Sequence, residues 1–244
     1  RKSTPFAAQV AAETCGETLE AALLLARLGT VHQHRGDPAS ARPCIEEAMS
    51  RFAAAGDTQQ AAVCLLNLGL VAQDDGDLVA SLASFDAAIA LLIASGATLR
   101  LPAARSGRAG TLLLSGSLAE AARAFEDLLA QAPEVSASLR GFALGNLGVV
   151  ARLQGRPIEA EGLLEQAVAA HASAGRPSLV AQWQSSQALL ALEAGDGATA
   201  RRRIERLRPT GQASVDAEVQ VCAARIALAQ GDLGAAATAL DAEL

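Results

Sequence analysis

The sequence predicts an all-α protein, a right-handed superhelical solenoid of antiparallel helix pairs. Composition is the first reason: the chain is 51% hydrophobic but only 2% aromatic, without Tyr, whereas strands favour aromatic and β-branched residues. The second is a glycine that returns at intervals close to 40 residues. The third is a fixed placement of small and large apolar residues around each of these glycines.

Two glycine series mark the turns. The first is Gly36, Gly76, Gly116, Gly155, Gly195 and Gly231. Its intervals are 40, 40, 39, 40 and 36 residues. The second, about half a repeat away, is Gly16, Gly56, Gly96, Gly175 and Gly211, with Ala132-Pro133 filling its one gap. Each repeat therefore has two turns and two helices.

A helix-capping residue follows most glycines of the first series: Asp37, Asp77, Ser117, Asp196 and Asp232. A short side-chain acceptor at this place can bind the free N–H groups at the start of the next helix. Pro38 and Pro157 then lie where a first-turn proline is tolerated. Arg156 cannot cap, so we expect Glu159 to favour the start of that helix.

Packing positions are also repeated. Five residues after the glycine the residue is small: Ala41, Ser81, Ala121, Ala160, Ala200 and Ala236. Nine residues after it the residue is large and apolar: Ile45, Phe85, Phe125, Leu164, Ile204 and Leu240. Three repeats carry Leu-Gly before the turn, at Leu28-Gly29, Leu68-Gly69 and Leu147-Gly148. The small residues let two helices approach, and the large one fills the space between successive pairs.

Together these residues resemble the tetratricopeptide repeat: Leu-Gly in the first helix, Gly-Asp at the turn, then Ala and a large apolar residue in the second helix. The resemblance covers almost the whole chain. The period exceeds the common length of about 34 residues, so the chain resembles the long-repeat form found in bacterial multidomain signalling regulators. Arg108-Ala109, Gln187-Ala188 and Ala223-Ala224 replace Leu-Gly in three repeats.

We expect one array over residues 1–244. It would comprise a leading half-repeat helix at Pro5–Cys15 and about six helix pairs from about Thr18 to Leu244, without strands. The chain begins at Arg1 and lacks an apolar secretory segment, so we expect it to be a piece of a longer cytoplasmic protein.

Charge and apolar content exclude two kinds of partner. A net charge of −6 argues against nucleic acid, because neutralising phosphates needs clustered Lys and Arg. No apolar run reaches the roughly 18 residues of a membrane span. The exception in charge is a cluster of arginines, Arg201, Arg202, Arg203, Arg206 and Arg208. It has two interpretations, a solvated helix face or a patch for an acidic partner.

Catalytic and metal-binding patterns are missing from the sequence. The four cysteines are scattered, as buried thiols in a reducing compartment would be. His32 and His34 are two apart on a helix and face different ways, which is wrong for shared metal ligation. No nucleophile with a base, no phosphate-binding loop and no carboxylate pair is found. We therefore expect no enzyme activity and no cofactor, and we interpret Trp183 as a packing residue.

One face of each first helix is the expected binding surface, because it lines the concave side of such a solenoid. We name the residues 13, 9, 6 and 2 before each turn glycine the first-helix stripe. From it we predict these partner contacts: Arg27, Val63, Asn67, Leu70, Asp74, Leu114, Asn146, Val149, Leu153, Gln182 and Leu189. The resemblance implies that Asn67 and Asn146, at one place in two repeats, hold a peptide backbone. Alternatively, the two Asn are simply solvated and the apolar residues pack against neighbouring helices.

Two functions fit this surface. The first is a non-catalytic scaffold that binds a protein, a peptide or a helix in its concave groove, the partner being another protein or another domain of the same chain. The alternative is a sensor segment of a bacterial multidomain regulator that responds to a small molecule or a partner. A spacer without a groove ligand is a third interpretation.

Overall fold

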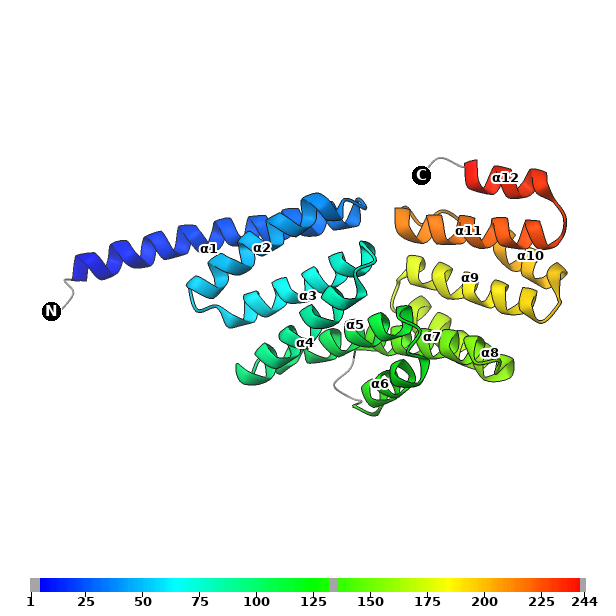
Figure 1. The fold of residues 1–244 in the computed structure, drawn as a ribbon, viewed down its shortest axis with the longest axis horizontal. Coiled ribbons are helices and arrows are strands. Elements are labelled where there is room, and N and C mark those ends of the chain that lie inside the picture. Colours follow the sequence, from blue (N-terminus) through cyan, green and yellow to red (C-terminus); the bar gives the residue numbers. More distant parts are fainter. Residues whose placement is uncertain (1–4, 132–135, 242–244) are drawn as a thin grey trace. The chain divides into compact units, whose positions relative to one another are not determined.

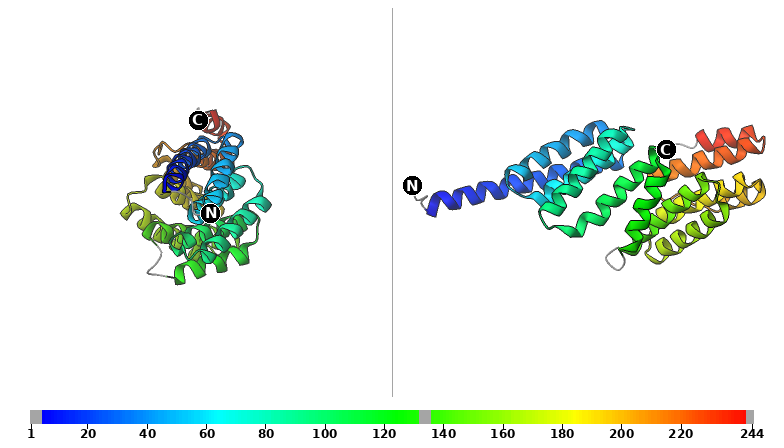
Figure 2. Two further views of the ribbon diagram at one scale, coloured as in Figure 1. Left: turned by 90° about the vertical axis from the view of Figure 1, so that its left-hand side faces the viewer. Right: turned by 60° about the horizontal axis from the view of Figure 1, so that its bottom comes forward.

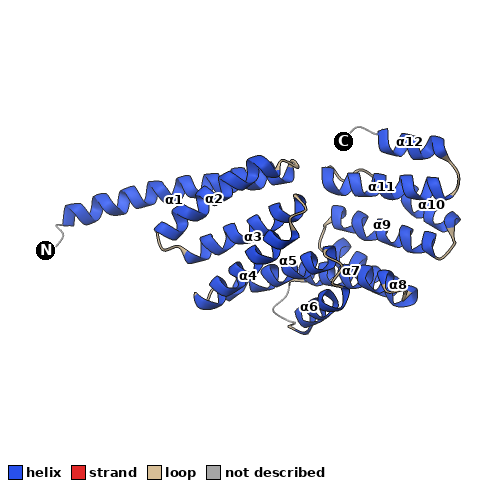
Figure 3. Ribbon diagram, in the orientation of Figure 1, coloured by secondary structure: helices blue, strands red, loops and turns tan. Residues whose placement is uncertain are grey.

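The computed structural model describes residues 5–131 and 136–241, and it describes the side chains in these ranges except at 5–17, 213 and 214. Twelve α-helices, one 3-10 helix and no strand occur in these ranges (Figures 1 and 3). The chain forms two compact units, Arg1–Ser115 and Gly116–Leu244. The all-α prediction is confirmed, while a single array over residues 1–244 stays a prediction.

The first unit contains α1 (Pro5–His34), α2 (Pro38–Ala54), α3 (Thr58–Asp74), α4 (Leu78–Ala94), the 3-10 helix η1 (Thr98–Arg100) and α5 (Leu101–Leu114). Each α-helix packs on the next one along the chain. In addition, α3 contacts both α1 and α5, so the first helices of successive repeats form a common layer.

The second unit contains α6 (Leu118–Ala130), α7 (Ala137–Leu153), α8 (Pro157–Ser173), α9 (Pro177–Glu193), α10 (Gly197–Glu205), α11 (Ala213–Ala229) and α12 (Leu233–Asp241). Here too each helix lies beside the next one, as the views in Figure 2 show. The first helices again meet, because α9 contacts both α7 and α11.

The predicted turn glycines adopt the conformation that only glycine takes readily. All six glycines of the first series have positive φ, between 71° and 82°, which an L side chain would resist. Four members of the second series, Gly56, Gly96, Gly175 and Gly211, do the same. Nine of these ten glycines lie at helix ends, where the sequence predicts them, whereas Gly211 lies in the loop after α10, which already ends at Glu205.

Gly16 is the exception, and here the expected turn is wrong. The backbone continues as one helix from Pro5 to His34, so the expected leading helix and the first helix of the first pair are joined. An interior glycine costs a helix only about 1 kcal/mol. Gly16 is followed by Glu17 and Thr18, without the capping residue that starts a new helix at Gly36 or Gly76.

Capping follows the prediction at most turns. Asp37, Asp77, Asp196 and Asp232 each accept a hydrogen bond from a first-turn backbone N–H, at 2.9–3.0 Å. Hydrogen bonds from Ser40, Thr199 and Ala235 hold the pKa of Asp37, Asp196 and Asp232, respectively, below the ordinary value. Arg156 is the N-cap residue of α8 without a side-chain cap, and it forms an ion pair with Glu159.

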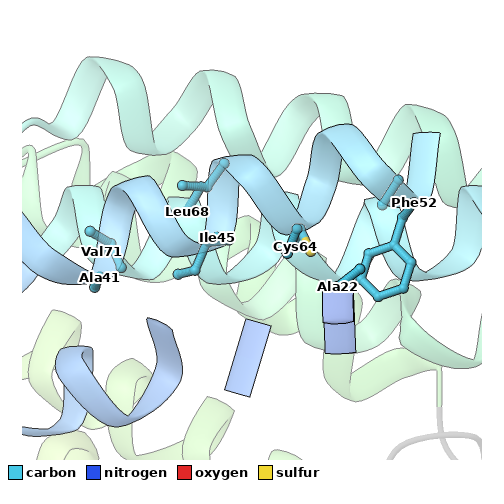
Figure 4. Close-up of a cluster of buried hydrophobic side chains, with 9 residues drawn as sticks. Ala22, Ala41, Ile45, Phe52, Cys64, Leu68 and Val71 are labelled. Carbon is cyan, nitrogen blue, oxygen red and sulfur yellow. The ribbon is translucent and has the colours of Figure 1, made fainter. Parts of the chain in front are cut away.

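The core of the first unit confirms the predicted packing positions. Ile45 and Phe85 are buried, and each lies against the glycine of a Leu-Gly pair. A Cβ on Gly29 would lie 2.4 Å from Ile45 Cγ1, and one on Gly69 would lie 2.8 Å from Phe85 Cζ. Figure 4 shows Ile45 in the cluster around α2, with Phe52, Cys64, Leu68 and Val71 among its members.

The core of the second unit uses the same device and adds a second one. A Cβ on Gly148 would lie 2.8 Å from Leu164 Cγ, which repeats the contact of Gly69 with Phe85. Trp183 is 98% buried and packs in one cluster with Leu144 and Leu164. The interpretation of Trp183 as a packing residue agrees with this position.

The fifth helix pair, α9 with α10, has a shortened second helix. Helix α10 has 9 residues, whereas α2, α4 and α8 have 17 each. The interval of 36 residues between Gly195 and Gly231 reflects this difference. The chain leaves α10 after Glu205 and reaches α11 through a loop containing Pro209.

Candidate functional site

The first-helix stripe of the first unit is held together by hydrogen bonds between helices. Gln33 of α1 donates to Asp74 of α3 at 3.1 Å. Asn67 of α3 donates toward Thr30 of α1 at 3.5 Å. These contacts align the C-terminal halves of the two first helices, so stripe residues from different repeats lie close together.

Predicted contact residues of the first unit are mostly accessible. Arg27, Leu70, Asp74 and Leu114 are exposed, and Val63 and Asn67 are half-buried. The exposed fraction is 37% for Leu70 and 62% for Leu114. Two apolar side chains therefore face solvent on the same layer of helices as a positive and a negative charge.

Asp74 has a shifted acidity. Partial loss of water around the carboxyl group raises its pKa, and the hydrogen bond from Gln33 opposes this rise. A carboxylate that is already partly desolvated binds a positively charged or N–H donor with less additional loss of hydration. Asp74 is thus suited to accept hydrogen bonds at the end of the stripe.

The stripe residues of the second unit are less exposed to solvent than those of the first unit. Asn146 is buried and its amide donates to the carbonyl of Phe142 in the same helix, at 2.9 Å. Leu189 is also buried, with 7% exposed, while Val149 and Gln182 are half-buried. Leu153, with 51% exposed, is the accessible apolar residue among these predicted contacts. Asn67 and Asn146 share a place in the repeat but not an environment.

Charged groups link the first helices of the second unit. Arg152 of α7 forms an ion pair with Glu193 of α9 at 2.5 Å. Burial raises the pKa of Glu218 on α11, and a hydrogen bond with the Gln182 side chain opposes the rise. Gln182 and Glu193 are therefore already engaged by neighbouring first helices.

Exposure along the stripe follows position in the repeat. The residue two before each turn glycine is exposed in all six repeats: His34, Asp74, Leu114, Leu153, Glu193 and Ala229. Nine residues before the glycine, Asn146, Ser186 and Cys222 of the second unit are buried, whereas Arg27 of the first unit is exposed. The accessible part of the stripe lies at the C-terminal ends of the first helices.

The cysteines have the environment of buried thiols. Cys44, Cys64 and Cys222 are free, and burial raises the pKa of Cys64 to about 11 and also raises that of Cys222. Cys15 lies outside the described side chains. Among the side chains that are described, no three His, Cys, Asp or Glu residues come together as a metal ion would require.

The arginine cluster divides into separate environments. Arg203 binds Glu161 through two hydrogen bonds, of 2.7 and 3.1 Å, and Arg201 forms ion pairs with Glu205 and Asp232. Arg206 and Arg208 instead border a pocket of about 460 Å³ in the second unit. The cluster is therefore neither one solvated face nor one patch.

This pocket was not predicted from the sequence. It lies between the start of α9 and the loop after α10, and Arg176 is the third arginine that lines it. Two signals could have indicated it, namely the shortened last interval and the arginines beside Pro209.

Comparison with known families agrees with this architecture. A family model described as "Tetratricopeptide repeat" matches residues 19–94, and a second model with the same description matches residues 143–174. Both matches fall on helix pairs with the Gly29–Ile45, Gly69–Phe85 and Gly148–Leu164 contacts. The chain has the fold of a tetratricopeptide-repeat helical solenoid, and residues 19–94 and 143–174 match the sequence of that repeat.

Solved structures share this tetratricopeptide-repeat fold. The Rap conjugation gene regulator of plasmid pLS20, in complex with the Phr* peptide, has a TM-score of 0.74 at 14% identity, over 91% of this chain and 60% of that one. A Rap protein complexed with Competence and Sporulation Factor has a TM-score of 0.73 at 14% identity, over 91% and 62%. A putative kinesin light chain from Podosopora anserina with nearly identical TPR-like repeats has a TM-score of 0.55 at 19% identity, over 80% and 95%.

The chain spans about 60% of the length of each of these two Rap proteins. Identities this low show the fold alone. No curated protein sequence matches the chain. In the described ranges, no helix has the length and the apolar character needed to cross a bilayer.

Proposed function

We propose that this tetratricopeptide-repeat chain is a non-catalytic interaction scaffold that binds a peptide or a helix on the first-helix stripe of its first unit. The observation that carries the proposal is the exposure of Leu70, one turn after Asn67 on α3, and of Leu114 on α5, a helix that contacts α3. Exposed apolar side chains can pack against the hydrophobic residues of a partner, and the Asn amide can form hydrogen bonds with the partner's backbone.

Charge in the same region adds orientation to the proposed binding. Arg27 on α1 and Asp74 on α3 are exposed charges of opposite sign. A bound segment with an acidic residue near Arg27 and a basic residue near Asp74 would be attracted electrostatically at both places. The reverse orientation would place like charges together and weaken binding. The stripe of the second unit contributes less, because Asn146 and Leu189 are buried there.

The Rap likenesses support a peptide as the partner, because one of those structures is a complex with the Phr* peptide and the other a complex with Competence and Sporulation Factor. They also favour the second candidate function, a regulatory segment of a larger bacterial protein. In that case peptide binding would change the stability of the repeats and so the state of an attached domain. Three free cysteines suit a reducing compartment such as the cytoplasm.

A peptide selection tests the scaffold proposal. A library of short random peptides is selected on the immobilised chain, and the affinities of selected peptides are measured by fluorescence anisotropy. Asn67→Ala and Leu114→Asp are the test variants, and Val79→Asp is the control, because Val79 is 81% exposed on a second helix. Asn146→Ala is a second control, since that amide is bound to its own helix.

We expect the affinity to fall by about tenfold or more in Leu114→Asp and by a few-fold in Asn67→Ala. Val79→Asp and Asn146→Ala should bind like the wild type. Peptides that bind Leu114→Asp as tightly as the wild type would refute the proposed surface, and so would a selection that yields no saturable binder. Circular dichroism of each variant checks that the helices are retained.

A further inference from the structure

The pocket beside α9 has arginines on its rim and an apolar wall. Arg176, Arg206 and Arg208 line it, together with Pro177, Val180 and Leu207. No Asp or Glu is among its lining residues, all of which the structure describes. In a chain with a net charge of −6, three arginines lining one hollow are a local reversal of charge.

The short α10 creates this hollow. In α2, α4 and α8 the second helix continues for 17 residues, whereas α10 ends after 9. Proline at position 209 cannot continue a helix interior, so the chain turns aside at residues 206–210. The N-terminal half of α9, from Pro177 to Gln184, then lines an open space with this loop.

Hydrogen bonds fix the wall of the pocket in place. The Asp216 carboxylate of α11 accepts from the backbone N–H and hydroxyl of Thr210, each at 2.8 Å, and from the N–H of Gly211 at 3.0 Å. The bond from the Thr210 N–H is the main reason that the pKa of Asp216 is lowered. Because the loop is held by three bonds, the pocket is formed before any ligand arrives.

The carboxylates near the pocket are already engaged. Asp216 is used by the loop, and Glu205 forms an ion pair with Arg201 at 3.5 Å. Arg208 donates to the carbonyl of Glu205 at 3.5 Å, a weak bond that leaves the rest of its guanidinium available. The positive charge of Arg176 reaches His171, where it adds to burial in lowering the imidazole pKa.

Helix α9 adds a further preference for negative charge. Its N-cap residue is Arg176, which supplies no side-chain acceptor, and its first residue Pro177 lines the pocket. The N-terminus of a helix carries a partial positive charge. The arginine rim and this helix end therefore favour the same sign of ligand charge.

We propose that this pocket binds a carboxylate carried on an apolar body. The planar guanidinium forks of Arg206, Arg208 and Arg176 match a carboxylate, and Val180, Leu207 and Pro177 receive the apolar part. A peptide with a free C-terminus and a small organic acid share this chemistry. The pocket lies in the second unit, so the proposal is independent of the peptide site on the first-helix stripe.

Calorimetric titration of the whole chain tests the proposal. The probes are a short peptide ending in Leu with a free carboxylate, the same peptide as its C-terminal amide, hexanoate, and hexanamide. Fluorescence of Trp183, the single Trp of the chain, provides a second signal because Trp183 lies in the helix that lines the pocket. The test variants are Arg206→Gln, Arg208→Gln and the double variant, and Arg140→Gln, an exposed arginine on α7, is the control.

We expect saturable binding of the acid forms, at least about tenfold tighter than the amide forms. Each single substitution should weaken the binding of the acids by a few-fold, and the double substitution should weaken it by more than tenfold. Arg140→Gln should leave their affinity unchanged. A peptide acid that binds more tightly than hexanoate identifies a chain terminus as the occupant, and the reverse identifies a small acid. Equal binding of acids and amides, unchanged binding in the double variant, or no saturable binding would overturn the proposal.

Discussion

Gly145 lies directly against the indole of Trp183: a Cβ added to this glycine would be 2.4 Å from Cε2 of the ring. Trp183 also packs edge-on to Phe142, with ring centroids 5.9 Å apart. The largest side chain of the second unit thus fits into a space that exists only because the facing helix has no side chain at this position. Close packing of this kind makes α7 and α9 dependent on each other.

Gly145→Ala should destabilise the second unit, because the rigid buried indole cannot move away from the new methyl group. Overpacking of a core typically costs about 1–3 kcal/mol. This cost exceeds the stabilisation of up to about 1 kcal/mol that Ala gains over Gly in helix propensity. The free energy of unfolding is measured from urea titrations followed by Trp183 fluorescence.

Gly162→Ala is the matched control for this change. Gly162 is also inside a helix of the second unit, but a Cβ there would meet nothing within 4 Å. It should therefore raise the unfolding free energy by about 0.5–1 kcal/mol. If Gly145→Ala were as stable as Gly162→Ala, the contact with Trp183 would not limit packing.

Spacing in the sequence was enough to predict the helix pairs, because turn geometry and helix approach each require a particular residue. Positive φ requires glycine at Gly36 or Gly155, and close approach requires Gly69 opposite Phe85. The contact of Gly145 with Trp183 lies outside this periodicity, since no other repeat has a Trp. The spacing also predicts a turn at Gly16, but α1 continues through it, because spacing alone does not end a helix.

The candidate site was less predictable than the fold. A stripe fixes which helix face a residue lies on, but exposure depends on the size of neighbours in adjacent repeats. Leu70 and Leu189 hold the same place, and they differ in exposure, at 37% and 7%. The arginine pocket depends on the length of one helix and on a loop held by Asp216, neither of which follows from a repeat pattern.

His171 should make the stability of the second unit depend on pH. It is fully buried beside Trp183, with ring centroids 6.5 Å apart. Burial, and then the charge of Arg176, lower its pKa from 6.5. Below about pH 6.5 the unfolded chain binds a proton that the folded chain does not, so the free energy of unfolding should fall as pH falls. Above it, this residue contributes no slope.

Urea titrations at a series of pH values check this expectation. The slope from His171 cannot exceed about 1.4 kcal/mol per pH unit. His171→Leu removes the titrating group and should remove most of the slope between about pH 7 and pH 5. A wild-type slope that persists in His171→Leu would show that another group is responsible.

Asp77→Ala should loosen the start of α4. The Asp77 side chain accepts the Ala80 N–H at 2.9 Å, and loss of an N-cap acceptor costs about 0.5–2 kcal/mol. Hydrogen exchange of the first-turn amides of α4 measures the effect locally. Asp77→Asn keeps an acceptor and should exchange like the wild type. Equal protection in the Ala variant would mean that the cap does not stabilise this helix.

Arg203 and Glu161 should be energetically coupled, because their ion pair joins three helices. Arg203 of α10 donates to both carboxylate oxygens of Glu161 on α8 and, at 2.8 Å, to the carbonyl of Gln187 on α9. Both side chains are about one-third exposed, which reduces screening by water compared with a surface pair.

A double-mutant cycle with Arg203→Ala and Glu161→Ala should give a coupling energy of about 1–2 kcal/mol. The matched cycle is Arg201 with Glu205, whose nitrogen and oxygen are 3.5 Å apart and whose side chains are 43% and 64% exposed. That pair should couple by less than about 0.5 kcal/mol. Arg203→Lys should lose most of the coupling energy. One ammonium group cannot replace a guanidinium group that binds both carboxylate oxygens of Glu161 and also the carbonyl of Gln187. Equal coupling in the two cycles would mean that bridging three helices adds nothing to an ordinary surface ion pair.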